Sequence, residues 1–155
     1  MVQSADLVRL WNRRQPVRGK LADLRRSPLF AGLSDRELTV LAAHLDEAWV
    51  PAGTVLVREG HRNPAFWLVV EGLAAVSIQG RERRVIGPGG HFGATSMLDG
   101  LGASATVVAR TPLRALVAST VQFGALTGNP RVSERLRCES EKRLRADLMD
   151  LVTAS

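Results

Sequence analysis

The residue types that could do chemistry in this chain gather in one glycine-rich stretch, residues 88–107. Gly93 follows Phe92, and further glycines stand just before them, so the backbone can take positive-φ turns and approach a ligand closely. Thr95 or Ser96 is expected to cap one short turn of helix, whose unpaired N–H groups and positive dipole end would face the same hollow. This combination predicts a cradle for a small anion.

Short strands must position this cradle. Between Glu47 and Ser119, β-rich runs are separated by Gly, Pro and Asn at intervals of about 8 to 12 residues, which is typical of a sandwich or barrel. Apolar residues alternate, so Phe66 and Leu68 are expected to face the core and Trp67 to point the other way, toward a helix or a rim. The expected strands are residues 48–50, 55–58, 66–70, 74–79, 83–86, 105–109 and 113–117.

Helices are expected on both sides of the strands. Ser34 and Glu37 form a capping-box pattern at the start of one of them, and Thr120 is expected to cap another. The expected helices span residues 5–15, 20–26, 35–45, 120–126 and 131–152.

The last of these helices carries a narrow apolar stripe. Such a stripe fits two roles: covering the mouth of the strand domain, or pairing with the same helix of a second copy. We favour the homodimer, with intramolecular packing as the alternative. The stripe consists of Val132, Leu136, Leu144, Leu148 and Val152.

The stretch Phe-Gly-Ala-Thr-Ser-Met-Leu-Asp-Gly at residues 92–100, followed by Ser-Ala-Thr-Val at 104–107, resembles the phosphate-binding cassette of the cyclic nucleotide-binding domain family. Upstream landmarks at residues 27–34, 51–60 and 66–72 resemble that family in the same order. The resemblance implies an α+β, mainly β fold: a β-roll, or double-stranded jelly roll, flanked by N-terminal helices and a long C-terminal helix.

The resemblance also implies a domain division. We expect an N-terminal helical segment over residues 1–26 and a cyclic nucleotide-binding-like domain over 27–155. Within it, the β-roll would occupy about residues 47–118 and the C-terminal helices about 120–153. The residues that the resemblance implies for ligand binding are Phe92, Gly93, Ala94, Thr95, Ser96, Met97, Ala103, Ser104 and Ala105. His91 and Arg84 are auxiliary candidates, because they lie close to the cradle in the sequence.

Two positions depart from the family pattern. Ala94 stands where the family carries a Glu that accepts from the ribose hydroxyl, and Ala103 stands where it carries an Arg that pairs with the cyclic phosphate, whereas Ser104 is retained. A hydrogen bond to a charged group contributes roughly 1.5 to 3 kcal/mol, so losing both costs about two to four decades of affinity. We therefore expect cAMP to bind weakly, or a related small anion to take its place.

Composition sets the broad class. The chain has 155 residues, 45% of them hydrophobic, which suits one domain with a proper core. No apolar run approaches the roughly 20 residues needed to span a bilayer. The single cysteine, Cys138, excludes an intramolecular disulfide, which agrees with a reducing compartment. We expect a cytoplasmic protein without membrane contact.

The net charge is +6, which makes nucleic acid a partner to consider. The arginines are dispersed along the chain and form no single basic stripe, so solvated faces account for them better. Family members that act as transcription factors carry a helix-turn-helix module after the final helix, and none follows it here. We expect no DNA-binding module in this chain.

Catalysis has little support. The histidines His44, His61 and His91 share no metal-ligand spacing with one another or with Cys138. Neither a nucleophile elbow nor a Walker-type loop is present. We expect no enzyme activity, no metal and no cofactor, with cAMP as the candidate ligand.

Two functions remain open. The first is a regulatory ligand-sensing module, in which a cyclic nucleotide or another small anion fills the cradle and shifts the flanking helices. The second is a degenerate, ligand-free module that kept the fold as a platform for protein interaction or dimerisation. Ala94 and Ala103 favour the second, and the retained glycines and Ser104 favour the first.

Overall fold

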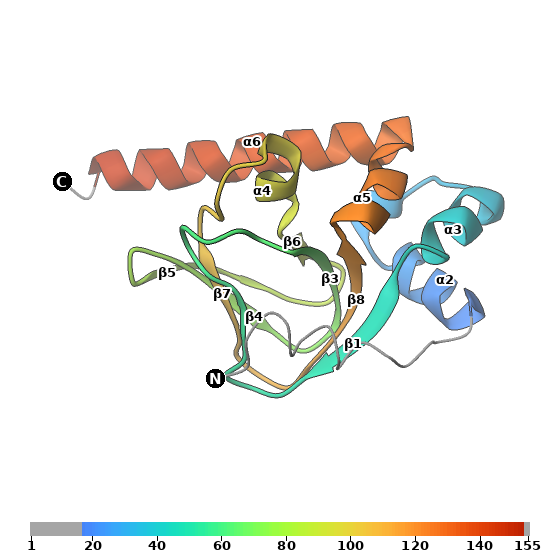
Figure 1. Ribbon diagram of the computed structural model, residues 1–155, viewed down its shortest axis with the longest axis horizontal. Helices are drawn as coiled ribbons and strands as arrows, with labels where there is room; N and C mark the ends of the chain where they lie inside the picture. Colours follow the sequence, from blue (N-terminus) through green and yellow to red (C-terminus); the bar gives the residue numbers. More distant parts are fainter. Residues whose placement is uncertain (1–16, 154–155) are drawn as a thin grey trace.

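The computed structural model describes residues 17–153 as a β-roll with helices on its outer side (Figure 1). The strands are β1 (Asp46–Val50), β2 (Val55–Val57), β3 (Ala65–Glu71), β4 (Ala74–Ile78), β5 (Arg81–Ile86), β6 (His91–Phe92), β7 (Thr106–Ala109) and β8 (Leu113–Ser119). The helices are α2 (Val17–Arg25), η1 (Pro28–Phe30), α3 (Asp35–Ala42), α4 (Ala94–Asp99), α5 (Thr120–Thr127) and α6 (Pro130–Thr153).

Two four-stranded antiparallel sheets make the roll. One has the order β1-β8-β3-β6 and the other the order β2-β7-β4-β5. Apolar side chains from both sheets fill the space between them, among them Leu56, Trp67, Val76 and Val107. The α+β, mainly β architecture expected from the sequence, a β-roll flanked by helices, is confirmed.

The face of β3 that meets this core is the opposite of the predicted one. Trp67 is buried between the sheets and stacks on Phe92, with ring centroids 5.9 Å apart and planes 9° from parallel. Phe66 and Leu68 lie on the outer face of the same strand, where they pack with the helices. Both faces of β3 are buried, so the alternation of residue types could not distinguish the inner face from the outer one.

The helices form a second apolar layer over the sheet that contains β3 and β8. Val132 and Leu136 from the first half of α6 are fully buried in this layer, together with Leu38 of α3 and Leu126 of α5. Asn129 Nδ2, just before α6, donates to Glu37 Oε2 at 2.9 Å. The first half of α6 is therefore fixed to the domain by intramolecular packing.

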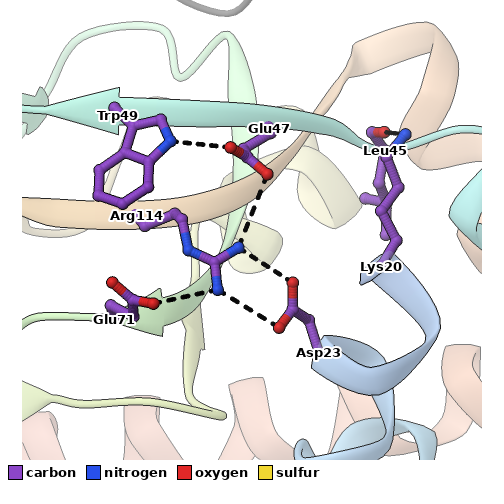
Figure 2. A network of polar contacts seen from close by, with 7 residues as sticks. All are labelled: Lys20, Asp23, Leu45, Glu47, Trp49, Glu71 and Arg114. Carbon is purple, nitrogen blue, oxygen red and sulfur yellow. Dashed lines mark hydrogen bonds and ion pairs between the residues drawn. The ribbon is translucent and has the colours of Figure 1, made fainter. Parts of the chain in front are cut away.

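A polar network fixes α2 to the roll (Figure 2). Arg114 on β8 reaches three carboxylates on three other elements, those of Asp23, Glu47 and Glu71. Lys20 Nζ donates to the carbonyl oxygen of Leu45 at 2.7 Å. Since Lys20, Asp23 and Glu47 are all buried, these contacts tie α2 closely to the β1 side of the roll.

Most expected elements form with small changes at their ends. The strands expected from the sequence are present as β1 to β5, β7 and β8, whereas the two-residue β6 was not predicted. The first helix after the roll is capped by Ser119, whose side chain accepts from the Gln122 amide, and not by Thr120 as expected. The helix expected over residues 5–15 lies outside the described residues. None of the helices in the described part of the chain combines the length and apolar character needed to cross a membrane.

Candidate functional site

The cradle begins with a left-handed turn at Gly93. This residue has φ +93°, and an added Cβ would lie 2.5 Å from the Ala65 carbonyl oxygen and 2.9 Å from Asn63 Nδ2. Asn63 Nδ2 donates to the Gly93 carbonyl oxygen at 2.8 Å, which holds the turn in place. Only glycine satisfies both the backbone angle and the close approach at this position.

The helical turn after Gly93 starts two or three residues earlier than predicted. Helix α4 begins at Ala94, and its N-terminal cap position is Gly93, which offers no side chain. Thr95 and Ser96 therefore lie inside the helix and do not cap it. Thr95 Oγ1 instead donates to Ser140 Oγ on α6 at 3.1 Å, which joins the cradle to the last helix.

A hollow lies between the cradle and α6. The cradle side is formed by the turn at Gly93, the start of α4 and the segment before β7. The residues lining it are Val57, Val76, Arg84, Ile86, Phe92, Gly93, Thr95, Ser96, Ala103, Ser104, Ala105, Val107, Arg143, Leu144 and Asp147.

Most of the predicted site residues meet in this hollow. Three of them do not line it: His91 lines a different hollow, and Ala94 and Met97 face the apolar layer under the helices. Ala94 is only 3% exposed there, so the position where the family carries a Glu is an apolar packing position in this chain. Ala103 lines the hollow together with Ser104 and Ala105, so the segment before β7 brings no charged side chain into it. Which of the lining residues bind a ligand stays a prediction.

Arg84 supplies a positive charge to the hollow from β5. Its Nη2 lies 2.6 Å from Asp147 Oδ1 on α6. Arg83, the preceding residue, does not line the hollow and pairs with Asp150, while its Nε lies 3.7 Å from Asp147 Oδ1. Among the described residues, Asp147 is therefore the carboxylate that engages Arg84.

A second positive charge comes from α6 itself. Arg143 lines the hollow, and its Nε lies 3.7 Å from Glu139 Oε1. Burial lowers the pKa of the Arg143 guanidinium, and the charge of Arg84 lowers it further, while Glu139 and Asp147 act in the opposite direction. The hollow thus brings together two partly exposed guanidiniums and one largely buried carboxylate.

The hollow is small. Its cavity volume is about 50 Å³, whereas sites for small organic ligands occupy roughly 300 to 1,000 Å³. Figure 1 shows α6 running past α4 along one side of the roll. Arg143, Leu144 and Asp147 form the α6 side of the hollow.

His91 does not face the cradle. It is buried at the start of β6 and lines a different hollow, of about 380 Å³, together with Ser27, Arg135 and Lys142. Burial, and after it the charge of Arg143, lowers the pKa of His91 to about 3. The ring is neutral at physiological pH, so the auxiliary role expected for His91 in pairing with an anion in the cradle is not supported.

Nothing in the described residues suggests a metal centre. No three His, Cys, Asp or Glu side chains between residues 17 and 153 are grouped to hold an ion. Cys138 is an exposed free thiol on α6.

Some lining residues were not predicted from the sequence: the apolar Val57, Val76, Ile86 and Val107 come from strands of the roll, and three more residues come from α6. Arg143, Leu144 and Asp147 are about 40 residues from the cassette in the chain and meet it only through the fold. The one sequence signal was Leu144 in the apolar stripe, which predicted that this helix could cover the mouth of the roll.

Residues 47–129 match the family model described as the cyclic nucleotide-binding domain. The chain is 31% identical over 137 residues to a cyclic nucleotide-gated potassium channel of Mesorhizobium japonicum, covering 88% of this chain and 35% of the channel. It is 33% identical over 107 residues to a cAMP-dependent protein kinase regulatory subunit of Yarrowia lipolytica, covering 68% of this chain and 28% of the subunit. The chain thus spans only a minor part of these relatives.

Solved structures with a similar fold agree with this family match. The catabolite activator protein of Thermus thermophilus superposes with a TM-score of 0.71 at 30% identity, covering 82% of this chain and 63% of that one. The cAMP-bound fragment 141–441 of PfPKA-R superposes with a TM-score of 0.80, covering 87% of this chain and 47% of that one. At 18% identity, the latter match shows the fold alone.

Proposed function

Because the chain belongs to the cyclic nucleotide-binding domain family, we propose that it is a regulatory ligand-sensing module and not an enzyme. A cyclic nucleotide such as cAMP, or a related small anion, would occupy the hollow beside Gly93 and Ser104. Since α6 lines that hollow, a ligand that enters it must change the position of α6 or of its side chains. The movement of α6 is the signal that a partner would detect.

The observation that carries this proposal is the position of Arg84. The cassette has no arginine of its own at Ala103, yet Arg84 presents a guanidinium to the same hollow from β5. A guanidinium pairs with a phosphate through charge-assisted hydrogen bonds, which Ala103 cannot provide. Arg84 is therefore the residue that would replace the family arginine.

The affinity should be low. Arg84 is already engaged by Asp147, and the hollow must enlarge before a nucleotide fits. The position of the family Glu is an apolar alanine, so the ribose hydroxyl loses its acceptor. These costs agree with the weak cAMP binding expected from the sequence.

The test is a titration of the ¹⁵N-labelled protein with cAMP and with cGMP, followed by NMR. Binding in the hollow is expected to shift the amide signals of Gly93 to Ser96 and of Ser104. Arg84→Met is expected to raise the Kd about tenfold or more, since a hydrogen bond to a charged group is lost. Arg110→Met is the matched control, because Arg110 pairs with Glu82 on the surface and does not line the hollow.

Two results would overturn the proposal. If neither nucleotide at several millimolar shifts these signals, the chain is not a cyclic nucleotide sensor. If a nucleotide binds and Arg84→Met leaves the Kd unchanged, Arg84 does not replace the cassette arginine.

A second candidate function is a platform for dimerisation. It is favoured by the apolar residues on the last turns of α6, where Leu148 is 60% exposed and Val152 is 70% exposed. The spacing from Leu144 to Leu148 to Leu151 is four and then three residues, as at the d and a positions of a coiled coil. We infer that this part of α6 pairs with the same segment of a second copy, as expected from the sequence. The two functions are compatible, because the exposed Leu148, Leu151 and Val152 do not line the hollow.

A further inference from the structure

The carboxylate of Asp147 is buried in a place where a carboxylate needs a specific partner. Asp147 is 8% exposed, and its neighbours are the guanidiniums of Arg84 and Arg83. The Arg84 contact, at 2.6 Å, has the length of a strong charge-assisted hydrogen bond. An isolated carboxylate at this position would be costly, so the pair holds α6 against β5.

The same contact uses the group that an anionic ligand would need. Arg84 lines the hollow, and its guanidinium faces the Asp147 carboxylate. Arg83 has a second carboxylate partner in Asp150. Losing the Asp147 charge therefore frees Arg84 in particular.

One more contact and the packing of two α6 side chains support a closed arrangement around Asp147. Ser140, about two turns earlier on α6, accepts from Thr95 of α4 at 3.1 Å. Between these points, Arg143 and Leu144 fill the hollow and leave about 50 Å³. The segment 140–147 of α6 thus lies over the hollow, attached at one end to the cradle through Thr95 and at the other end to β5 through Arg84.

We propose that Asp147 is an internal anion that occupies Arg84 in the absence of ligand and keeps α6 closed over the hollow. The ligand in this inference rests on the proposed function, whereas the closure of α6 by the Asp147–Arg84 pair does not. An anion enters by displacing the Asp147 carboxylate from Arg84, and the released carboxylate then moves away from the hollow with α6. Asp147 sets which ligands bind, because only an anion that outcompetes a carboxylate already in place can bind there.

The first test needs no ligand. Hydrogen exchange of the α6 amides from residue 140 to residue 150 is measured in the wild type, in Asp147→Asn and in Asp150→Asn. Asp147→Asn keeps the size of the side chain and removes its charge, so exchange is expected to accelerate about tenfold or more. Asp150→Asn is the matched control on the same helix, because Asp150 is more exposed and does not line the hollow. Equal exchange in all three proteins would overturn the inference.

The second test measures cAMP binding by the same proteins and by Arg84→Met. Asp147→Asn is expected to lower the Kd about tenfold or more, and Asp150→Asn to leave it unchanged. Arg84→Met is expected to accelerate α6 exchange like Asp147→Asn, because it removes the partner of the Asp147 carboxylate. It is expected to raise the Kd, because it also removes the partner of the ligand. If Asp147→Asn leaves the Kd unchanged, Asp147 does not compete with the ligand for Arg84, and the inference is overturned.

The outcomes separate this inference from the proposed function. If the wild type does not bind cAMP and Asp147→Asn does, the internal anion is supported and the wild-type hollow is self-occluded. If no variant binds cAMP but Asp147→Asn and Arg84→Met both accelerate exchange, the closure by Asp147 stands and the nucleotide-sensing function fails.

Discussion

Arg114 on β8 lies with its Nη1 3.1 Å from Asp23 Oδ2 on α2, and this ion pair is the centre of the contacts between α2 and the roll (Figure 2). The guanidinium also lies 5.7 Å from the centre of the Trp49 ring, and Trp49 Nε1 donates to Glu47 Oε1 at 2.8 Å. Burial alone would lower the pKa of Arg114, but the hydrogen bond to Asp23 and the charges of Asp23 and Glu71 raise it above its ordinary value. Arg114 therefore stays charged and can keep its ion pair with Asp23 on α2.

Arg114→Met tests this anchor. The change leaves the buried carboxylates of Asp23 and Glu47 without their cation, and breaking a buried pair in this way costs about 3 to 5 kcal/mol. We expect urea unfolding to show a loss of that size in the free energy of unfolding. Arg110→Met, which breaks the exposed pair with Glu82, is the control and should cost about 1 kcal/mol or less. Equal losses for the two variants would show that the Arg114 network does not stabilise the fold.

Burial of His91 predicts a pH-dependent stability. The pKa of this ring is about 3 in the folded protein, against roughly 6.5 in an unfolded chain. Between these values the unfolded state binds one more proton, so the contribution of His91 is complete above pH 6.5 and is lost as the pH falls toward 3. Within this range the free energy of unfolding falls by about 1.4 kcal/mol for each pH unit.

The measurement is urea unfolding at pH 7.5 and at pH 5.0 for the wild type and for His91→Gln. From pH 7.5 to pH 5.0 the wild type should lose free energy of unfolding as the unfolded His91 takes up a proton. The variant lacks the titrating ring, so its loss should be smaller by roughly 2 kcal/mol. An identical pH dependence would mean that His91 takes up a proton in the folded protein.

The sequence predicted the strands well because turn residues separate them, but it could not determine which side of β3 faces the core. Trp67 and Phe66 are both buried, and only the packing of the helices on the outer face decides which is inside the roll. The two-residue β6 was missed because its pairing with β3 at Trp67 and Leu68 depends on a distant strand. Short elements of this kind have no periodicity to detect.

The cradle was predictable because its turn needs glycine at a fixed place, and Gly93 meets the need. The charges around it were not, because Asp147 and Arg143 come from α6 and their positions depend on how that helix packs. Arg84 was found as a candidate by its closeness in the chain, whereas His91, which is closer still, faces another hollow. Distance along the sequence is a poor guide to which face of a strand a side chain occupies.

Gly93→Ala should disrupt the cradle and lower stability. The methyl group would meet the Ala65 carbonyl oxygen at 2.5 Å in a left-handed backbone conformation, which together cost roughly 2 to 5 kcal/mol. Gly100→Ala is a matched control, since Gly100 has φ +73° but no atom within 4 Å of the added methyl. It should cost only about 1 to 2 kcal/mol for the backbone strain. Thermal unfolding of the two variants compares them, and a smaller loss for Gly93→Ala than for Gly100→Ala would contradict the prediction.

Ala103→Arg should restore the charge that the cassette lacks. A new guanidinium in the hollow is expected to lower the Kd for cAMP by about ten- to a hundredfold, at some cost in stability because only about 50 Å³ is free. Ala103→Met is the control for size, since it also fills the hollow and displaces α6 but carries no charge. Calorimetric titration of both variants separates the two effects. If Ala103→Met improves binding as much as Ala103→Arg, displacement of α6 and not the added charge limits the affinity.

Leu148→Glu should weaken self-association. Leu148 is 60% exposed on the last turns of α6, where it lies in line with Leu144 and Leu151, so a charge there would have to be buried in a paired helix. Sedimentation velocity at increasing protein concentration is expected to show a dimer for the wild type and a dimer dissociation constant at least about tenfold higher for the variant. Val40→Glu is the control, because Val40 on α3 is exposed to a similar extent, at 58%, and lies outside α6. If Val40→Glu disrupts the dimer and Leu148→Glu does not, the copies associate through another face. If the wild type stays monomeric at all concentrations, the dimer proposal is wrong. The exposed half of α6 would then serve a different partner, and the module would signal through that partner.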